Sequence, residues 1–326
     1  MDQRTLLLQN WLNTLLQAPF TLTPLAGDAS FRRYFRVHQN EQTWVAMDAP
    51  PPLENIVPFI TIATLLQKNQ IHAPRILHYH LEQGFILLSD LGDQLFLSIL
   101  NEQTVEHLYG HAFTTLHRLW HCEWDNLPLF DEGMILRELS LFVEWFLIKH
   151  LGLTLPSSTQ HLLQKTFRQL IQSAKEQPQV FAHRDFHSRN LLWIDPPQTV
   201  GVIDFQDAVR GPLTYDLISL VRDCYLAWPT PQVDRWILQF QQEALARGHL
   251  HETSTERFLR WADWMGIQRH CKAIGIFSRL KHRDNKTQYL QDIPRTLRYI
   301  CEVSRRHPEL TDFVTWLEDT VLEKVT

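Results

Sequence analysis

His183-Arg184-Asp185-Phe186-His187-Ser188-Arg189-Asn190 and, further along the chain, Ile203-Asp204-Phe205-Gln206-Asp207 are the segments from which the fold can be inferred. The first segment lies between two short apolar runs, 180–182 and 191–194, and the second begins at the end of a third run, 200–203. Short apolar runs that are separated by polar loops are typical of buried strands. We therefore expect two acidic loops to face one another.

Three residues in these loops have the types and the spacing that phosphoryl transfer requires. Asp185 is a carboxylate that can accept a hydroxyl proton, Asn190 supplies an amide oxygen for Mg²⁺, and Asp204 can bridge the metal to the phosphates. A single Asp or Asn is more often an ordinary turn residue. The pattern His-x-Asp-x-x-x-x-Asn, followed after fourteen residues by an Asp that ends an apolar strand, is much more specific. It predicts a catalytic and metal-binding site.

Composition excludes several other classes of protein. The chain has 326 residues, of which 44% are apolar, and 31 basic residues against 36 acidic ones give a net charge of −5. These values indicate a compact globular protein and make nucleic acid and membrane surfaces poor partners. The dinucleotide fingerprint, the Walker phosphate loop, the Gly-x-Ser-x-Gly elbow and the His-Glu-x-x-His helix are all absent from the sequence.

The cysteines and the N-terminus indicate a cytoplasmic protein. The four cysteines are far apart and form no Cys-x-x-Cys pair, which is typical of reduced thiols. The first twenty residues contain polar side chains among their leucines, so we expect neither a signal peptide nor a membrane span. The pairs His78/His80 and His117/His121 have no third ligand pattern beside them, and we expect them to be surface or packed residues. Nothing indicates an obligate protein partner.

Periodicity predicts strands in the first part of the chain and helices in the rest. Residues 2–17 have helical spacing, 34–38, 43–47 and 84–89 have the composition of strands, and 58–67 has that of a helix. Further helical patterns cover 105–120, 134–151, 159–174, 231–246, 254–280 and 309–323. We therefore expect an α+β protein with a small mixed α/β lobe and a larger, mainly helical lobe.

With these features the chain resembles the aminoglycoside phosphotransferase-like kinases over essentially its whole length. The segments 27–36, 46–51, 88–92, 201–208 and 264–270 look like a bacterial branch of that family. The resemblance implies the bilobal protein-kinase fold, with residues 1–92 as the nucleotide-binding lobe and 93–326 as the helical lobe that holds the catalytic loop and the substrate site. It also implies ATP and Mg²⁺ as cofactors. For that branch it implies phosphorylation of the anomeric hydroxyl of N-acetylmuramate or N-acetylglucosamine in cell-wall recycling.

The resemblance also assigns roles to individual residues. It makes Asp185 the catalytic base, Asn190 and Asp204 the Mg²⁺ ligands, and His183 a residue that braces the catalytic loop. Groups near Ser89, Asp90 and Leu91, chiefly of the backbone, would bind the adenine.

Two departures from protein kinases concern the phosphates of the nucleotide. Met47 stands where those kinases place a phosphate-binding Lys, and the loop 27–34 has a single Gly, so it cannot fold over phosphates as a multi-glycine hairpin does. The nearby cations are Arg32, Arg33 and Arg36, and an Arg fork can bind phosphate oxygens bidentately. Alternating Arg residues on a strand are also typical of a solvated face. We expect Ser30, Arg32 and Arg33 to contact the nucleotide, and Glu54 is the candidate for orienting the cation.

The sugar site is expected beside Asp185, in the helical lobe. Sugars are held by hydrogen-bonding charged groups and aromatic faces, and the residues that qualify are Asp185, Asp207, Arg222, Trp228, Trp264, Arg269, His270 and Lys272. The Arg and His residues in this set suit a neutral amino sugar, or one with a lactyl carboxylate, better than a polycationic aminoglycoside. The alternatives are a kinase of choline, an aminoglycoside or another sugar, and a nucleotide-binding pseudokinase. Intact Asp185, Asn190 and Asp204 argue against the pseudokinase.

Overall fold

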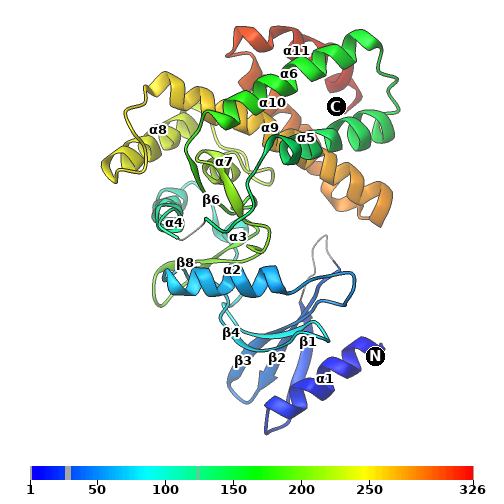
Figure 1. Ribbon diagram of the computed structural model, residues 1–326, viewed down its shortest axis with the longest axis vertical. Coiled ribbons are helices and arrows are strands. Elements are labelled where there is room, and N and C mark those ends of the chain that lie inside the picture. The colour runs from blue at the N-terminus through cyan, green and yellow to red at the C-terminus, as the bar shows by residue number, and fades with distance from the viewer. Residues whose placement is uncertain (1, 26–30, 123–124, 326) are drawn as a thin grey trace. The chain divides into compact units, whose positions relative to one another are not determined.

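The computed structural model describes residues 2–25, 31–122 and 125–325 (Figure 1). By its internal contacts the chain divides into two compact units, which are described separately below. The first comprises Met1–Glu123 and Arg189–Asp207, and the second comprises Trp124–Ser188 and Ala208–Thr326. Within the described residues, no helix has both the length and the hydropathy that a membrane span needs.

The first unit is built on a five-stranded antiparallel sheet with the strand order β1-β2-β3-β5-β4. Tyr34 of β2 is paired with Met47 of β3, and Met47 is paired with Ile86 of β5. Side chains alternate between the two faces of a strand, so Arg33 and Phe35 lie on one face of β2 and Tyr34 on the other. The strands are β1 (Thr21–Leu25), β2 (Arg33–Gln39), β3 (Gln42–Asp48), β4 (Ile76–His80) and β5 (Phe85–Ser89).

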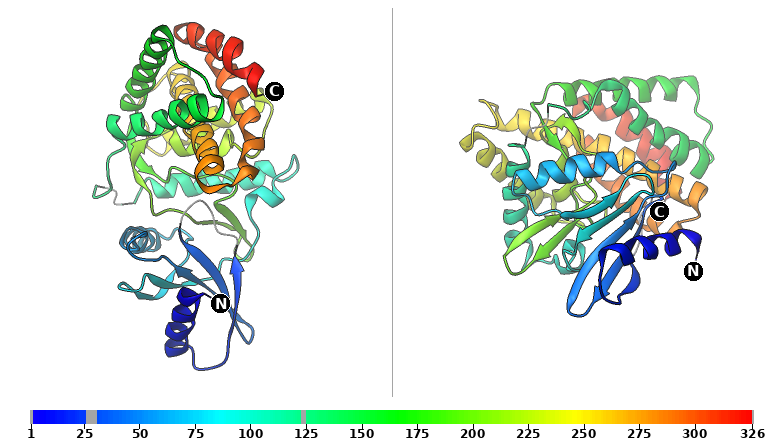
Figure 2. Two further views of the ribbon diagram at one scale, coloured as in Figure 1. Left: turned by 90° about the vertical axis from the view of Figure 1, so that its right-hand side faces the viewer. Right: turned by 60° about the horizontal axis from the view of Figure 1, so that its bottom comes forward.

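Two helices pack on this sheet or beside it. Helix α1 (Gln3–Leu15) inserts Leu8 and Leu12 into a core that includes Phe35 and Val37, and it lies against the sheet in both views of Figure 2. Helix α2 (Val57–Lys68) has a proline in its first turn. The ring centroids of Phe59, on this helix, and Phe205 are 4.8 Å apart. The face of β2 that carries Phe35 is therefore the α1 face.

The chain returns to the first unit after the catalytic loop. Strands β7 (Leu191–Ile194) and β8 (Thr199–Val202) form a hairpin, and the Val202 N–H donates a hydrogen bond of 2.8 Å to the His72 carbonyl. Helices α3 (Phe96–Ile99) and α4 (Val105–Leu119) complete the unit, with α4 packed against β8. Asn190 and Asp204, which flank the hairpin, therefore belong to the same unit as the sheet.

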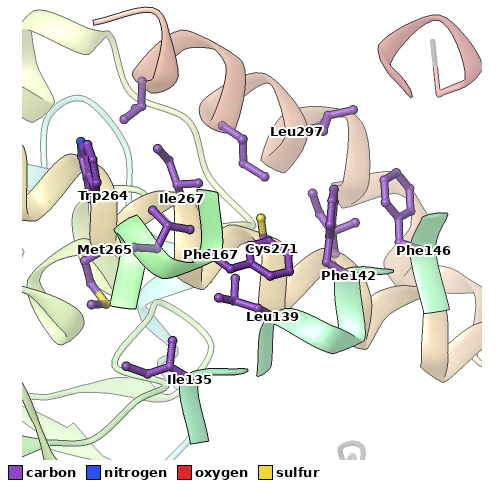
Figure 3. Packing of buried hydrophobic residues seen from close by; sticks show 14 of the residues in the cluster. Ile135, Leu139, Phe142, Phe146, Phe167, Trp264, Met265, Ile267, Cys271 and Leu297 are labelled. Atoms are coloured by element: carbon purple, nitrogen blue, oxygen red, sulfur yellow. The ribbon is translucent and has the colours of Figure 1, made fainter. Parts of the chain in front are cut away.

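The second unit is organised around one long helix, α9 (Thr255–Asp284). Every residue from 261 to 272 is buried, which is expected of a helix surrounded by others. Figure 3 shows Ile267 and Cys271 of α9 in a cluster with Leu139 and Phe142. The surrounding elements are α5 (Glu132–Leu141), the π-helical segment η1 (Phe142–His150), α6 (Ser157–Lys175), α7 (Tyr215–Val221), α8 (Thr230–Ala246) and α10 (Ile293–Ser304).

Shorter elements close the second unit. Strands β6 (Gln179–Ala182) and β9 (Val209–Pro212) pair with each other. In the sequence, β6 precedes and β9 follows residues 189–207, which belong to the first unit. After α10 the chain ends in η3 (Pro308–Leu310), α11 (Thr311–Trp316), η4 (Leu317–Val321) and η5 (Leu322–Lys324), and η2 (Thr287–Asp292) precedes α10.

The expected α+β class is confirmed, and several elements differ from the sequence prediction. The pattern over 134–151 gives α5 and then the π-helical η1 instead of one helix, and β1, β9, α7 and α10 were not predicted. Strand β1 contains Pro24 and lies at the sheet edge, where proline is tolerated. The boundary expected after residue 92 separates nucleotide binding from substrate binding, and it stays a prediction.

Candidate active site

Asn190 and Asp204 lie side by side at the open end of the β7–β8 hairpin. Pairing of Leu191 with Val202 makes the residues just outside the hairpin neighbours. The Ile203 N–H donates to the Asn190 carbonyl at 3.0 Å, and Asn190 Nδ2 is 3.5 Å from Asp204 Oδ2. The structure therefore brings the two predicted Mg²⁺ ligands together.

Asp204 is further oriented by its backbone and by a neighbouring amide. Its φ of +63° places it in the left-handed region, which Asp enters at less cost than most residues. Gln206 Nε2 donates to Asp204 Oδ1 at 2.9 Å, while the buried Gln206 Oε1 has no hydrogen-bond partner among the described residues. Carboxylate and amide oxygens are the ligands that Mg²⁺ prefers. This donor set fits the predicted metal.

A mostly buried ion pair lies in the same unit as Asp204. Arg32 Nη2 pairs with Glu54 Oε2 at 3.1 Å, and the two side chains are only 11% and 12% exposed. Burial raises the pKa of Tyr34, the charge of Asp204 raises it further, and a hydrogen bond from Arg32 lowers it. Arg32 therefore contacts Tyr34, and the charge of Asp204 acts on the same hydroxyl. Met47, which pairs with Tyr34, is fully buried and contributes packing.

The two arginines of β2, Arg33 and Arg36, are each paired with two aspartates. Arg33 lies on the α1 face and binds Asp2 at 2.7 Å and Asp48 at 2.6 Å. Arg36 binds Asp90 at 2.6 Å and also pairs with Asp93. These pairs favour a structural role for Arg33 and Arg36, and they engage the side chain of Asp90.

The predicted adenine-binding segment lies at the end of β5. Ser89 Oγ accepts a hydrogen bond from the Arg75 N–H, and the Ser89 N–H donates to the Arg75 carbonyl, both at 2.9 Å. Leu91 packs so closely on Gly201 that a Cβ there would lie 3.2 Å from Leu91 Cδ1. Ser30, predicted to contact the nucleotide, lies outside the described residues.

In the second unit, the segment that carries Asp185 is held by two carboxylates of the α7 region. The N–H groups of His183 and Arg184 donate to the two oxygens of buried Asp216 at 2.6 and 2.9 Å. The Ser188 N–H donates to Asp223 at 2.9 Å. The Asp185 N–H donates to His183 Nδ1 at 3.3 Å, so His183 contacts the loop as a brace would.

Asp185 itself lies among cations. Lys272 Nζ is 3.6 Å from Asp185 Oδ1, and the Asp185 side chain is 38% exposed. Burial on its own raises the pKa of Asp185, but the charges of Lys272 and Arg269 oppose it and hold the pKa below its usual value. Asp185 is therefore an accessible, ionised carboxylate, which is the state a general base requires.

Most of the predicted sugar-binding residues have partners of their own. Arg222 is buried and binds Asp263 at 2.7 Å. His270 contacts the Arg222 carbonyl at 2.9 Å, and burial lowers its pKa to about 3. Trp264 lies in the core (Figure 3). These contacts favour structural roles for the three residues.

The remaining three lie in different surroundings. Asp207 is exposed, belongs to the first unit and accepts a 3.4 Å hydrogen bond from Gln206. Trp228 is half-buried with its ring edge-on to Trp236. Arg269 is buried, donates to the Cys224 thiol at 3.5 Å, and forms no ion pair with a carboxylate of the described residues. Among the sugar-site candidates, Arg222 and Lys272 pair with carboxylates, so Arg269 has the least compensated charge of the three.

The carboxylates that support this loop were not among the predicted site residues. Asp216 and Asp223 lie at the two ends of an apolar run, 217–221, and Glu138 lies in the helical pattern of α5. Charged residues inside apolar stretches are seldom buried unless they are paired. That signal was present in the sequence, although it did not indicate which partners the carboxylates would bind.

Comparisons with known proteins show the family to which the chain belongs. The sequence matches the phosphotransferase enzyme family over residues 21–260. It is 44% identical to the N-acetylmuramate/N-acetylglucosamine kinase of Pseudomonas aeruginosa, over 90% of this chain and 87% of that protein. Choline kinase LicA from Streptococcus pneumoniae has a TM-score of 0.67 at 10% identity, with 92% of this chain and 100% of that chain covered. Aminoglycoside 2'-phosphotransferase-IIIa has a TM-score of 0.61 at 14% identity, with 94% and 99% covered.

The chain therefore belongs to the phosphotransferase enzyme family. Its fold is the protein-kinase-like fold of the solved choline kinase and aminoglycoside phosphotransferase, as the sequence predicted. At these low identities the structural likeness shows the fold alone.

Proposed function

We propose that this enzyme transfers the γ-phosphoryl group of ATP to the anomeric hydroxyl of an amino sugar, N-acetylmuramate or N-acetylglucosamine, in cell-wall recycling. The observation that carries the proposal is the 44% identity, over nine-tenths of the chain, to a kinase named for these two sugars. The intact Asp185, Asn190 and Asp204 support it, because a protein that only binds nucleotide does not need all three. We place the reaction in the cytoplasm, without an obligate protein partner.

In the proposed mechanism Asp185 accepts the proton of the attacking hydroxyl. An anomeric hydroxyl is more acidic than an ordinary alcohol, so a carboxylate of low pKa suffices when the acceptor is well positioned. Asp216, Asp223 and His183 fix the backbone around Asp185. The base is therefore presented by a rigid loop.

The phosphates would be held by the first unit. Asn190 and Asp204 would bind Mg²⁺, with Gln206 orienting Asp204. When bound, the metal neutralises charge on the phosphate oxygens during transfer. Arg32, fixed by Glu54, would contact phosphate oxygens in place of the missing Lys, and backbone groups of 89–91 would bind the adenine. Residues 1–92 would thus form the nucleotide-binding lobe.

The sugar would be bound in the second unit beside Asp185. Arg269 is the residue that we assign to the lactyl carboxylate of N-acetylmuramate, because burying a guanidinium without a carboxylate partner is costly unless a ligand supplies the anion. N-acetylglucosamine lacks this carboxylate and would leave Arg269 with its thiol contact.

The direct test is a panel of acceptors with ATP and Mg²⁺, containing both amino sugars, glucose, choline and kanamycin. Phosphorus NMR of the products identifies the hydroxyl that carries the phosphate. The proposal expects a sugar 1-phosphate from one or both amino sugars. Phosphorylation at another hydroxyl, or of choline or kanamycin in preference, would reject the assignment, and a lack of Mg²⁺-dependent ATP consumption with every acceptor would favour the pseudokinase.

A further inference from the structure

Lys272 occupies an unusual position in α9. The side chain of this cation is only 8% exposed, and its Nζ lies 3.6 Å from Asp185 Oδ1 and 3.4 Å from Glu138 Oε1. It also donates to the Tyr215 hydroxyl at 3.1 Å. A buried ammonium is costly unless its charge and its three donors are matched. Here the two carboxylates and the hydroxyl meet that need.

Glu138 is the centre of the support behind Lys272. It pairs with Arg184 and accepts a 2.8 Å hydrogen bond from Gln268 Nε2, while the Tyr215 hydroxyl lies 3.5 Å from it. With Asp185, Glu138 gives two carboxylates against the two cations Lys272 and Arg184. Lys272 is therefore held both by Asp185 and by a second carboxylate, Glu138, that takes no part in the proposed reaction.

We propose that Lys272 is the positioning residue of the catalytic base: it orients the Asp185 carboxylate through an ion pair that Glu138 holds in place, and it keeps that carboxylate ionised. The inference rests on the proposed function for the role of Asp185 as base. It assigns to Lys272 a task other than contact with the sugar carboxylate.

The other groups that face Asp185 fit this role less well. Arg184, its neighbour in the chain, is turned to Glu138. Burial lowers the pKa of His187 to about 4, so this side chain is neutral near pH 7. Arg269, one turn before Lys272 on α9, contacts the Cys224 thiol and no carboxylate of the described part of the chain. Lys272, by contrast, lies within ion-pair distance of Asp185.

The first test measures the ionisation of Asp185 without enzyme turnover. Aspartate is labelled with ¹³C at the side-chain carboxyl, and the Asp185 signal is identified by its loss in Asp185→Asn. The chemical shift of this signal is followed as a function of pH. Lys272→Met removes the charge and keeps the length of the side chain, so the pH at the midpoint of this titration should rise by roughly one to three units. Lys272→Arg should leave it close to that of the parent.

The second test measures turnover with the best acceptor of the panel. Lys272→Met should lower kcat by roughly 10- to 100-fold with little change in the KM for ATP, and the loss should grow toward acid pH. Lys272→Arg should recover part of kcat. Arg260→Met is the matched control, because Arg260 lies on the same helix in an exposed ion pair with Glu309, and it should change neither readout.

The outcomes separate this inference from the proposed function. If no amino sugar is phosphorylated, the proposed function fails, while the Asp185 signal still tests Lys272. The inference is wrong if the Asp185 signal has the same pH dependence in the parent and in Lys272→Met. It is also wrong if Lys272→Met and Lys272→Arg have the same kcat, because Lys272 would then contribute packing alone.

Discussion

Asp185 is the side chain whose replacement has the most direct expected effect. Asp185→Asn keeps the shape of the side chain and removes the base, so turnover should fall roughly 10²- to 10⁴-fold while ATP affinity stays nearly constant. Initial rates and nucleotide binding measured on the same preparation check this. More than a tenth of parental turnover in this variant would exclude Asp185 as the base.

Arg32 and Arg33 form a natural pair for testing the nucleotide cation. Arg32→Ala should raise the KM for ATP or lower kcat by roughly tenfold or more, because a charge-assisted contact to phosphate is lost. Arg33→Ala should leave both values near those of the parent and lower thermal stability, because it removes a partner of the fully buried Asp48. The opposite result, with Arg33→Ala alone impairing ATP use, would move the phosphate contact to the α1 face.

Arg269 should distinguish the two amino sugars. Arg269→Met should lower kcat/KM for N-acetylmuramate by an amount that corresponds to about 1–3 kcal/mol of lost transition-state stabilisation, the range for a charge-assisted hydrogen bond. The kcat/KM for N-acetylglucosamine should hardly change. Arg222→Met is the control: Arg222 is paired with Asp263, so its loss should lower stability without changing the ratio between the sugars. Equal losses for both sugars in Arg269→Met would leave the lactyl carboxylate without an assigned partner.

Between secondary-structure elements, the contact of α9 with the α5–η1 junction depends on one glycine. A Cβ at Gly275 would lie 2.4 Å from the carbonyl carbon of Leu141, so Gly275→Ala should destabilise the protein by about 1–3 kcal/mol or more through overpacking. Gly110, within α4, has no atom within 4 Å of such a Cβ. Gly110→Ala should therefore be neutral or stabilising by up to about 1 kcal/mol. Urea unfolding of both variants checks this, and equal effects would contradict it.

For the protein as a whole, buried neutral histidines should limit stability in mild acid. Burial lowers the pKa of His187 to about 4 and the pKa of His270 to about 3. In an unfolded chain a histidine has a pKa of about 6.5. As the pH falls below about 6.5, the unfolded state takes up protons that the folded state does not. Each histidine should then cost about 1.4 kcal/mol of stability per pH unit.

Urea unfolding at about pH 7.5, 6 and 5 measures this loss. Most carboxylates remain ionised over that interval, so the slope reports the histidines. In His270→Gln the free energy of unfolding should fall less steeply with decreasing pH, by about 1.4 kcal/mol per pH unit, which is the contribution of one histidine. An unchanged slope in that variant would mean that His270 is protonated in the folded protein.

The fold class and the centre of the site follow from local features of the sequence. Asp185, Asn190 and Asp204 lie in loops between short apolar strands, and β7 and β8 form the hairpin that brings Asn190 to Asp204. Helices α4, α6 and α8 were also predicted to within a few residues, whereas the amphipathic α10 was not predicted. These features depend on neighbours in the chain, and therefore a single sequence contains them.

The partners of the charged residues depended on contacts between distant parts of the chain. Arg32 and Arg33 are adjacent in sequence, yet strand alternation directs Arg33 to α1 and Asp48, while Arg32 binds Glu54. Lys272 meets Glu138 across 134 positions of sequence, the difference between their numbers. Such ion pairs form because burial makes an unpaired charge costly, and only the packed chain determines which opposite charge is within reach.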